Sequence, residues 1–301
     1  MTRVMARNRR TQVRTSATQA TPSLAPHRGG GERRAWIHTV IGVVILAVLL
    51  FPLYWMINAS FQPSGALLKP EPSYFPTTFT LDGYRSTFAT QGSNVVTSLI
   101  VSLGTVVITL LLATPAAYAL AKLRVPARTS LMLVVITVQM IPGIVMANAL
   151  YIVFARLRLI DNYLGLMLAD ATTAVPFAIL IMRAFMQDIP QELMEAARID
   201  GAGELGVFRS IVVPMSRNSI ITAGLFAFLH GWSDFLFAVT LTTGSAFTPV
   251  TVGIYRFMGA QTADWNGVMA TATVASIPAV FLLILVQKYI AAGITGGAVK
   301  E

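Results

Sequence analysis

Residues 95–120 read VVTSLIVSLGTVVITLLLATPAAYAL, an apolar run that contains no charged side chain. A helix of about 20 such residues, rising about 1.5 Å per residue, crosses the hydrocarbon layer of a membrane, which is about 30 Å thick. Five further apolar runs of similar length lie at about residues 36–57, 131–154, 163–185, 219–243 and 268–290. The sequence therefore predicts an all-α integral membrane protein with six transmembrane helices.

The composition points to lipid as the solvent. Of the 301 residues, 55% are hydrophobic and only 12% are charged, whereas soluble domains carry about 25% charged residues. The sequence contains no cysteine, which excludes disulfides and thiolate-based metal or redox sites. The net charge of +9 would suit nucleic acid, but the basic residues cluster before the first apolar run, as a topology signal does. We expect membrane lipid and no nucleic acid as a partner.

The basic residues also predict the orientation. With the N-terminus inside, 17 of the 22 Lys and Arg residues fall in cytoplasmic segments and five in outer segments. Because cytoplasmic loops of membrane proteins carry the excess of Lys and Arg, both termini are expected to be cytoplasmic. Residues 1–34 are rich in Arg, Thr, Ser, Gly and Pro, and we expect a disordered basic tail. Residues 35–301 are expected to form the transmembrane domain, with a core at about residues 94–290.

A long cytoplasmic connection between the fourth and fifth runs, residues 188–214, reads DIPQELMEAARIDGAGELGVFRSIVVP. The first half predicts a short helix that Asp188 caps, with Gln191 three residues further on as in a capping box. Gly201 and Gly203 are expected to end this helix.

A second helix is expected from about Glu204 to just before Pro214, because the residue before a proline is disfavoured in helical geometry. Two interpretations of the whole connection stay open at this point. Ala196 and Ala197 leave little side chain at the centre of the first helix, so another protein could approach its backbone closely and dock there. Alternatively, the connection is an amphipathic segment that lies at the lipid headgroups.

The spacing of this segment resembles the cytoplasmic EAA signature of permease subunits of bacterial ATP-binding-cassette (ABC) importers. Val213 stands where that family usually has leucine, which keeps an apolar side chain. The resemblance implies that the segment is a coupling helix seated in a cleft of an ATPase subunit. The ATPase-coupling residues that it implies are Glu195, Ala196, Ala197, Asp200, Gly201, Ile211 and Pro214.

From about residue 36 onward the chain is similar to the smaller of the paired permease subunits of maltose-type sugar importers. The strings that carry this similarity include Met140-Ile-Pro142, Pro176-Phe177, Arg183-Ala-Phe185, Gly231-Trp-Ser-Asp-Phe-Leu-Phe237 and Gln287-Lys-Tyr289. The resemblance implies a type I ABC importer permease fold in a bacterial plasma membrane, with the coupling helix between spans 4 and 5.

The same resemblance implies the cargo and the partners. The cargo would be a sugar or related polyol that an extracytoplasmic solute-binding protein delivers. The partners would be a second homologous permease subunit and a homodimeric ABC ATPase. Gly297 and Lys300 near the C-terminus are candidates for a further contact with the ATPase, and an inert tail is the alternative.

No ATP site is expected on this chain. Such a site needs a glycine-rich loop that ends in Lys-Ser or Lys-Thr between a strand and a helix, and the sequence contains none. We therefore expect a transport subunit that is not itself an enzyme and binds no cofactor, with ATP and Mg²⁺ on the partner ATPase.

Four residues are candidates for the substrate path: Asn148, Asp170, Trp232 and Asp234. Carboxylates inside spans are costly and count as functional candidates, and Asp170 lies in a polar patch that suits a water-filled cavity. Structural roles compete with this one: Asp234 would tie helices together, Trp232 would anchor the chain at the membrane interface, and Asn148 would hydrogen-bond between helices.

Two other functions compete with an ATP-driven importer. A secondary transporter or channel driven by an ion gradient would use Asp170 and Asp234, but it leaves the EAA segment without a purpose. An intramembrane protease would need the same two carboxylates at hydrogen-bonding distance from each other.

Overall fold

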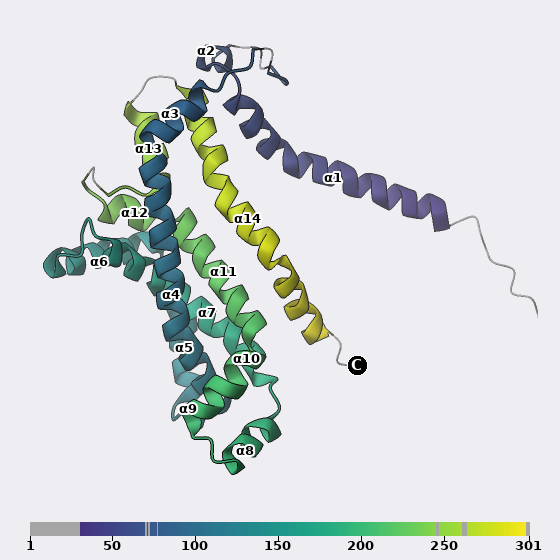
Figure 1. The fold of residues 1–301 in the computed structure, drawn as a ribbon, viewed down its shortest axis with the longest axis vertical. Helices are drawn as coiled ribbons and strands as arrows, with labels where there is room; N and C mark the ends of the chain where they lie inside the picture. Colours follow the sequence, from purple (N-terminus) through teal and green to yellow (C-terminus); the bar gives the residue numbers. More distant parts are fainter. Residues whose placement is uncertain are drawn as a thin grey trace, which may run out of the picture. The chain divides into compact units, whose positions relative to one another are not determined.

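The computed structural model describes residues 31–69, 71, 73–76, 78–244, 247–260 and 264–298. Within this part of the chain the regular elements are all helices (Figure 1). The chain divides into two compact units, residues 1–51 and 52–301. The helices are α1 (Gly31–Ser60), α2 (Ser64–Leu67), α3 (Asp82–Thr90), α4 (Gly92–Lys122), α5 (Arg128–Val138), α6 (Gly143–Leu157), α7 (Tyr163–Gln187), α8 (Gln191–Ile199), α9 (Glu204–Val207), the π-helix η1 (Phe208–Val212), α10 (Val213–Met215), α11 (Arg217–Ser233), α12 (Leu236–Leu241), α13 (Val250–Ala260) and α14 (Trp265–Ala298).

Four of the described helices, α1, α4, α7 and α14, are long and apolar enough to cross a membrane. Two bent pairs also meet this criterion when each is taken together: α5 with α6, bent by 97°, and residues 204–215 with α11, bent by 77°. The all-helical membrane fold is therefore confirmed. The predicted count of six spans is reached if each bent pair is one span.

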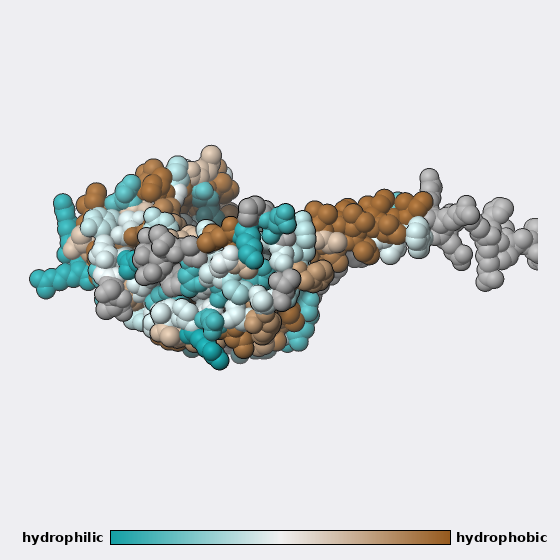
Figure 2. Space-filling view, turned by 90° about the horizontal axis from the view of Figure 1, so that it is seen from above, coloured by the Kyte–Doolittle hydropathy of each residue, from teal (hydrophilic) through white to brown (hydrophobic). Residues whose placement is uncertain are grey.

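Helix α1 begins the described part of the chain. It starts at Gly31, so residues 31–34, which were expected to belong to the tail, are helical. No proline or further glycine follows until Gly42, so nothing local stops the helix before its apolar part. From Val40 to Phe51 the sequence contains no polar residue, as a helix immersed in lipid requires, and Figure 2 shows its hydrophobic surface in brown. Residues 1–30 of the expected tail lie outside the described residues.

The third apolar run, predicted as one helix over residues 131–154, is broken. Helix α5 ends at Val138 and α6 begins at Gly143, with Pro142 extended at φ −58° and ψ 132° between them. Proline has no N–H to donate and disfavours helical geometry at the residue before it. The helix therefore stops ahead of Pro142 and restarts in a new direction.

The fifth run, predicted over residues 219–243, also ends early. Helix α11 stops at Ser233, and Asp234 is extended at φ −62° and ψ 128°. The carboxylate of Asp234 accepts hydrogen bonds from the amides of Phe237 at 3.2 Å and Ala238 at 2.8 Å. A short acidic side chain that binds nearby backbone amides offers the chain an alternative to continuing the helix, and here it starts α12.

The centre of the second unit is the packing of α4 against α7 and α11 (Figure 1). Small residues make this contact: Ala113 and Ala117 of α4, Ala178 of α7 and Ala223 of α11 are all buried in one cluster. Small side chains let helix backbones approach closely, which is the main source of helix association in lipid.

Substitution of Met182 of α7 by alanine should destabilise the protein more than the same substitution of Met140. It is fully buried in the α4–α7 cluster, whereas Met140 is 78% exposed. Replacing a buried methionine by alanine typically costs about 2–5 kcal/mol. We expect Met182→Ala to lower the thermal unfolding midpoint of the detergent-solubilised protein by several degrees, and Met140→Ala to leave it nearly unchanged. Equal effects would contradict the packing described here.

The connection between α6 and α7 is held by Asp161. Its carboxylate accepts hydrogen bonds from the Thr243 hydroxyl at 2.7 Å and the Gly244 amide at 2.9 Å. Arg256 of α13 donates to the carbonyls of Thr242 and Gly244. Desolvation acts to raise the pKa of Asp161, but these hydrogen bonds and the charge of Arg256 outweigh it and lower the pKa below the ordinary value.

This lowered pKa predicts a loss of stability in acid. The folded-state pKa lies below the unfolded value of about 3.9, so the ionised form contributes stability above that pH and loses it as the pH falls through the folded value. We expect the thermal midpoint of Asp161→Asn to lie below that of the wild type near neutral pH and the difference to shrink below about pH 4. A difference independent of pH would contradict this assignment.

Candidate functional site

Helix α8 begins later than its sequence predicts. Pro190 occupies the N-cap position, and Asp188, predicted to cap α8, is instead the C-cap residue of α7. The predicted capping box is therefore absent: the side chain of Gln191 donates to the Glu195 carboxylate at 2.9 Å along the exposed side of the helix. Pro190 has an extended ψ of 133°, so the helical backbone begins only after it.

The end of α8 is defined by Gly201, as predicted. Gly201 has φ +91°, a conformation that glycine adopts far more readily than other residues. The Ala202 amide donates to the Ala197 carbonyl at 2.9 Å, and the Gly201 amide donates to the Arg198 carbonyl at 3.1 Å. These two bonds form a Schellman motif. A Cβ atom on Gly201 would meet no atom within 4 Å, so the requirement for glycine within this chain comes from the backbone.

The α8–α9 segment is anchored in the helix core. Met194 of α8, Val207 of α9 and Val212 of η1 are each at most 2% exposed. They belong to the same buried cluster as Tyr118 of α4 and Met186 of α7. A displacement of α8 would therefore be transmitted to α4 and α7, because closely packed interiors move as a unit.

A carboxylate reinforces this anchor. Glu204 accepts hydrogen bonds from Arg198 at 3.0 and 3.2 Å and from the hydroxyl of Tyr118 at 3.0 Å. These bonds join α8, the start of α9 and the end of α4 at one point. Lys122 adds a further link, since its ammonium group donates to the carbonyls of Gln187 and Ile189.

The side of the α8–α9 segment that faces away from this buried cluster carries exposed apolar side chains. Leu193 is 44% exposed, Ile199 86% and Leu205 59%, and Ala196 beside them is exposed as well. We call these four residues the coupling surface. Large exposed apolar side chains that cluster on a polar segment are typical of a protein-binding site.

The second helical stretch runs further than predicted. It continues from Glu204 through Pro214 to Met215, and the turn falls at Ser216. The wide π-turn of η1 explains the difference, because the Val213 amide donates to the Phe208 carbonyl, five residues back. Proline lies within the first turn of α10, where the N–H that it lacks is not needed. Ile211 is half-buried against the core and Pro214 is exposed.

The C-terminal candidates are only partly described. Gly297 lies in α14, and Lys300 lies outside the described residues.

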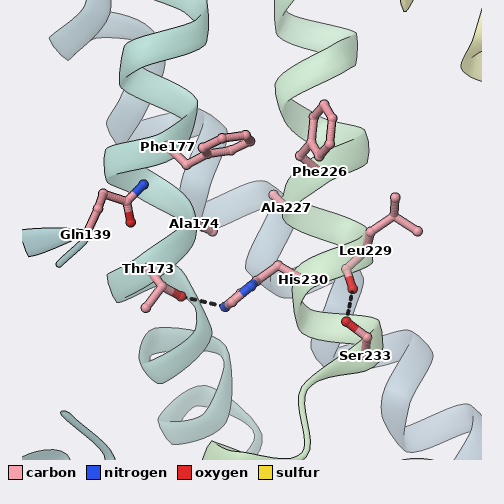
Figure 3. Close-up of a pocket in the computed structure, with 9 residues that line it drawn as sticks. All are labelled: Gln139, Thr173, Ala174, Phe177, Phe226, Ala227, Leu229, His230 and Ser233. Carbon is pink, nitrogen blue, oxygen red and sulfur yellow. Dashed lines mark hydrogen bonds between the residues drawn. The ribbon is translucent and has the colours of Figure 1, made fainter. Parts of the chain in front are cut away.

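A cavity of about 380 Å³ lies between α7 and α11 (Figure 3). An adjoining cavity of about 370 Å³ shares Thr173, His230 and Ser233 with it and is also lined by Asp234 and Gly143. The polar and aromatic residues that line the first cavity are Gln139, Thr173, Phe177, Phe226, His230 and Ser233.

Of the four path candidates, only Asp234 reaches these cavities, and its carboxylate is engaged with α12. Asp170 is fully buried between helices, where Thr105 donates to it at 3.5 Å, so it does not lie in a water-filled cavity. Trp232 is buried, and its indole donates to the Ala275 carbonyl of α14 at 3.0 Å, which ties two helices together rather than anchoring the chain at an interface. Asn148 lies exposed on α6 and lines neither cavity.

The residues that do line the first cavity were missed by sequence reasoning. Their spacing held a signal: Phe226, His230 and Ser233 follow at i, i+4 and i+7, and Thr173 and Phe177 at i and i+4, which places each set on one face of a helix. Among the described residues no group of His, Asp or Glu could hold a metal ion.

Comparisons with known proteins agree with this geometry. Residues 110–296 match the family described as "Binding-protein-dependent transport system inner membrane component". The trehalose transport system permease protein SugB of Mycobacterium tuberculosis is 32% identical over 90% of this chain and 99% of its own length. The diacetylchitobiose uptake system permease protein DasC of Streptomyces coelicolor is 29% identical over 89% of this chain and 97% of its own length.

A solved structure shares the fold. A chain of a bacterial ABC transporter involved in the import of the acidic polysaccharide alginate superimposes with a TM-score of 0.75 at 20% identity, over 88% of this chain and 99% of that one. Together with the family match, this fold identifies a membrane-spanning permease. The chain belongs to the family of inner membrane components of binding-protein-dependent transport systems.

Proposed function

We propose that this permease subunit imports a carbohydrate that an external solute-binding protein delivers, and that ATP hydrolysis on a separate ABC ATPase drives it. The family description supports the delivery by a binding protein. The names of the relatives, which refer to trehalose and diacetylchitobiose, support a carbohydrate cargo. The absence of a phosphate-binding loop from the sequence supports ATP and Mg²⁺ being bound by the partner ATPase.

The observation that carries this proposal is that the α8–α9 segment is exposed on one side and buried on the other. Its coupling surface exposes Ile199 and Leu205, while Met194 on its other side is buried with α4 and α7. Burying an exposed isoleucine or leucine contributes about 1.5–3 kcal/mol, so a cleft in a partner could bind this surface. Movement of that partner would then act on the spans as a rigid-body change.

The assembly follows from the same proposal. Segment 188–215 faces the cytoplasm, both termini lie on that side, and a homodimeric ATPase docks at the coupling surface. A second homologous permease completes the path, and the C-terminal segment around Gly297 and Lys300 provides a further contact with the ATPase. The contrast between 17 inner and five outer basic residues supports this orientation.

The geometry offers little to the competing functions. Asp170 and Asp234 hydrogen-bond to different partners and not to each other in the described part of the chain, whereas a carboxylate protease needs a shared site. Neither carboxylate accounts for the exposed coupling surface, which an ion-driven transporter would not require.

Substitution of Gly201 should uncouple transport. Valine is strongly disfavoured at φ +91°, so Gly201→Val is expected to disrupt the Schellman motif, reposition Ala202 and reduce uptake more than tenfold at normal membrane abundance. Gly201→Asn should retain more uptake, because asparagine tolerates this conformation. Gly203→Ala is the matched control, since Gly203 has φ −70° and open space around it. Normal uptake by Gly201→Val would count against the proposed coupling.

Cross-linking tests the docking directly. The native chain has no cysteine, so each introduced thiol is unique. In membranes that contain the whole transporter, Ile199→Cys should cross-link to the ATPase and react with an impermeant maleimide only from the cytoplasmic side. Thr129→Cys, which is exposed on α5, is the control and should not trap the ATPase. Failure of Ile199→Cys to trap the ATPase in an active transporter would refute the proposal.

A further inference from the structure

The cavity between α7 and α11 has a lining that lipid could not solvate. His230 and Ser233 of α11 and Gln139 at the end of α5 are exposed within apolar segments. Polar groups that contact hydrocarbon without a partner cost several kcal/mol each. This face must therefore be covered by water or protein, as the wall of a translocation path is.

The polar groups of the lining keep hydrogen-bonding capacity to spare. The side-chain amide of Gln139 makes no hydrogen bond to the described part of the chain. Ser233 donates to the Leu229 carbonyl at 2.7 Å, which leaves its oxygen free to accept (Figure 3). The Thr173 hydroxyl donates to the Asp170 carbonyl at 3.0 Å and is also hydrogen-bonded to Nε2 of His230 across the cavity. Thr173 therefore retains only an acceptor site, and His230 retains its other ring nitrogen. Several neutral donors and acceptors that face one small space suit a ligand with many hydroxyl groups.

Two aromatic rings complete the lining. Phe177 of α7 and Phe226 of α11 lie edge to face, with centroids 5.3 Å apart, and both remain about 40% exposed. Figure 3 shows them one or two helical turns away from His230 and Ser233. Apolar ring surface beside hydroxyl-binding groups matches a sugar ring, which presents C–H groups on its faces and hydroxyls at its edge.

The charged residues near the lining bear on whether an anionic or a neutral sugar would bind. Among the residues that the structure describes, no lysine or arginine lines either cavity, and Asp234 lines the second one. An anionic ligand would find no cation to pair with and would approach a negative charge, and both effects are strong where water is scarce. A neutral ligand meets neither penalty.

We propose that this cavity is a subsite for a neutral carbohydrate, in which His230, Thr173, Ser233 and Gln139 bind hydroxyl groups and Phe177 and Phe226 pack against the sugar ring. The subsite rests on the proposed carbohydrate import and adds to it that the permease itself disfavours acidic sugars. It does not depend on how the coupling surface engages its partner.

Thiol protection in the complete purified transporter tests this subsite. Ser233→Cys places a single thiol at the cavity, and its rate of reaction with a maleimide is measured with and without added sugar. Trehalose, maltose and diacetylchitobiose serve as neutral probes, and glucuronic acid at matched ionic strength as the anionic probe. At least one neutral sugar should slow the labelling severalfold and glucuronic acid should not, while the labelling of Thr129→Cys stays unchanged.

Uptake by variants provides the second measurement. With the neutral sugar that protects Ser233→Cys as substrate, His230→Phe should raise the KM for uptake by about 2- to 10-fold, the loss expected for one hydrogen bond. Phe177→Leu should also raise it. Phe281→Leu is the matched control, because Phe281 is an exposed aromatic residue on α14 that lines neither cavity. ATPase stimulation by the binding protein should stay normal in Phe281→Leu.

The outcomes separate the two proposals. Equal protection by neutral and anionic sugars, or protection by glucuronic acid alone, overturns the charge preference. No protection in a transporter that imports a neutral sugar overturns the subsite and leaves the proposed function intact. A transporter that imports no carbohydrate overturns both.

Discussion

The scarcity of water in the hydrocarbon layer is the constraint on which the rest of this structure depends. Each backbone amide there needs a partner within the protein, and helices provide it. Where a helix breaks, another group takes over the role: Asp234 binds the free amides at the start of α12. Where polar side chains are exposed and keep hydrogen-bonding capacity to spare, as around His230, the same constraint identifies a face that lipid does not cover.

The two proposed sites of this permease lie on different elements. The first cavity lies on α7 and α11, whereas the coupling surface lies on the α8–α9 segment. One buried cluster connects them, because it contains Met194 and Val207 of that segment together with Met182 of α7 and Ala223 of α11. Close packing through this cluster supplies a physical path along which movement at one site reaches the other.

The sequence predicted the class of fold because hydrophobic length alone decides it in lipid. It also predicted the end of α8, because only glycine adopts φ +91° easily. It did not predict where two of the apolar runs break. Pro142 and Asp234 act through local geometry and hydrogen bonds, and Pro52, Pro115, Pro176 and Pro278 remain inside continuous helices, so the presence of a proline does not settle the outcome.

The cavity was harder to foresee than the coupling segment. Asp170 and Trp232 stood out as costly or large residues, yet both are buried within the bundle rather than on a cavity wall. Trp232 donates to the Ala275 carbonyl, whereas Asp170 has one contact to Thr105 and a second oxygen without a partner among the described residues. The lining residues are individually ordinary, and they become a site only when α7 and α11 are placed face to face. The sequence identifies single unusual residues as candidates. A cavity, in contrast, depends on which helix faces the tertiary structure brings together.

The junction between α8 and the spans is built from Met182, Met186 and Met194, all at most 2% exposed. Methionine is unbranched, and rotation about its three side-chain bonds lets it fill spaces of different shape. Because these side chains can exchange rotamers, the contact can adjust to a small rotation of α8 without opening voids. Branched side chains at these three positions would make the same contact stiffer, so the choice of residue tunes how easily the bundle tilts.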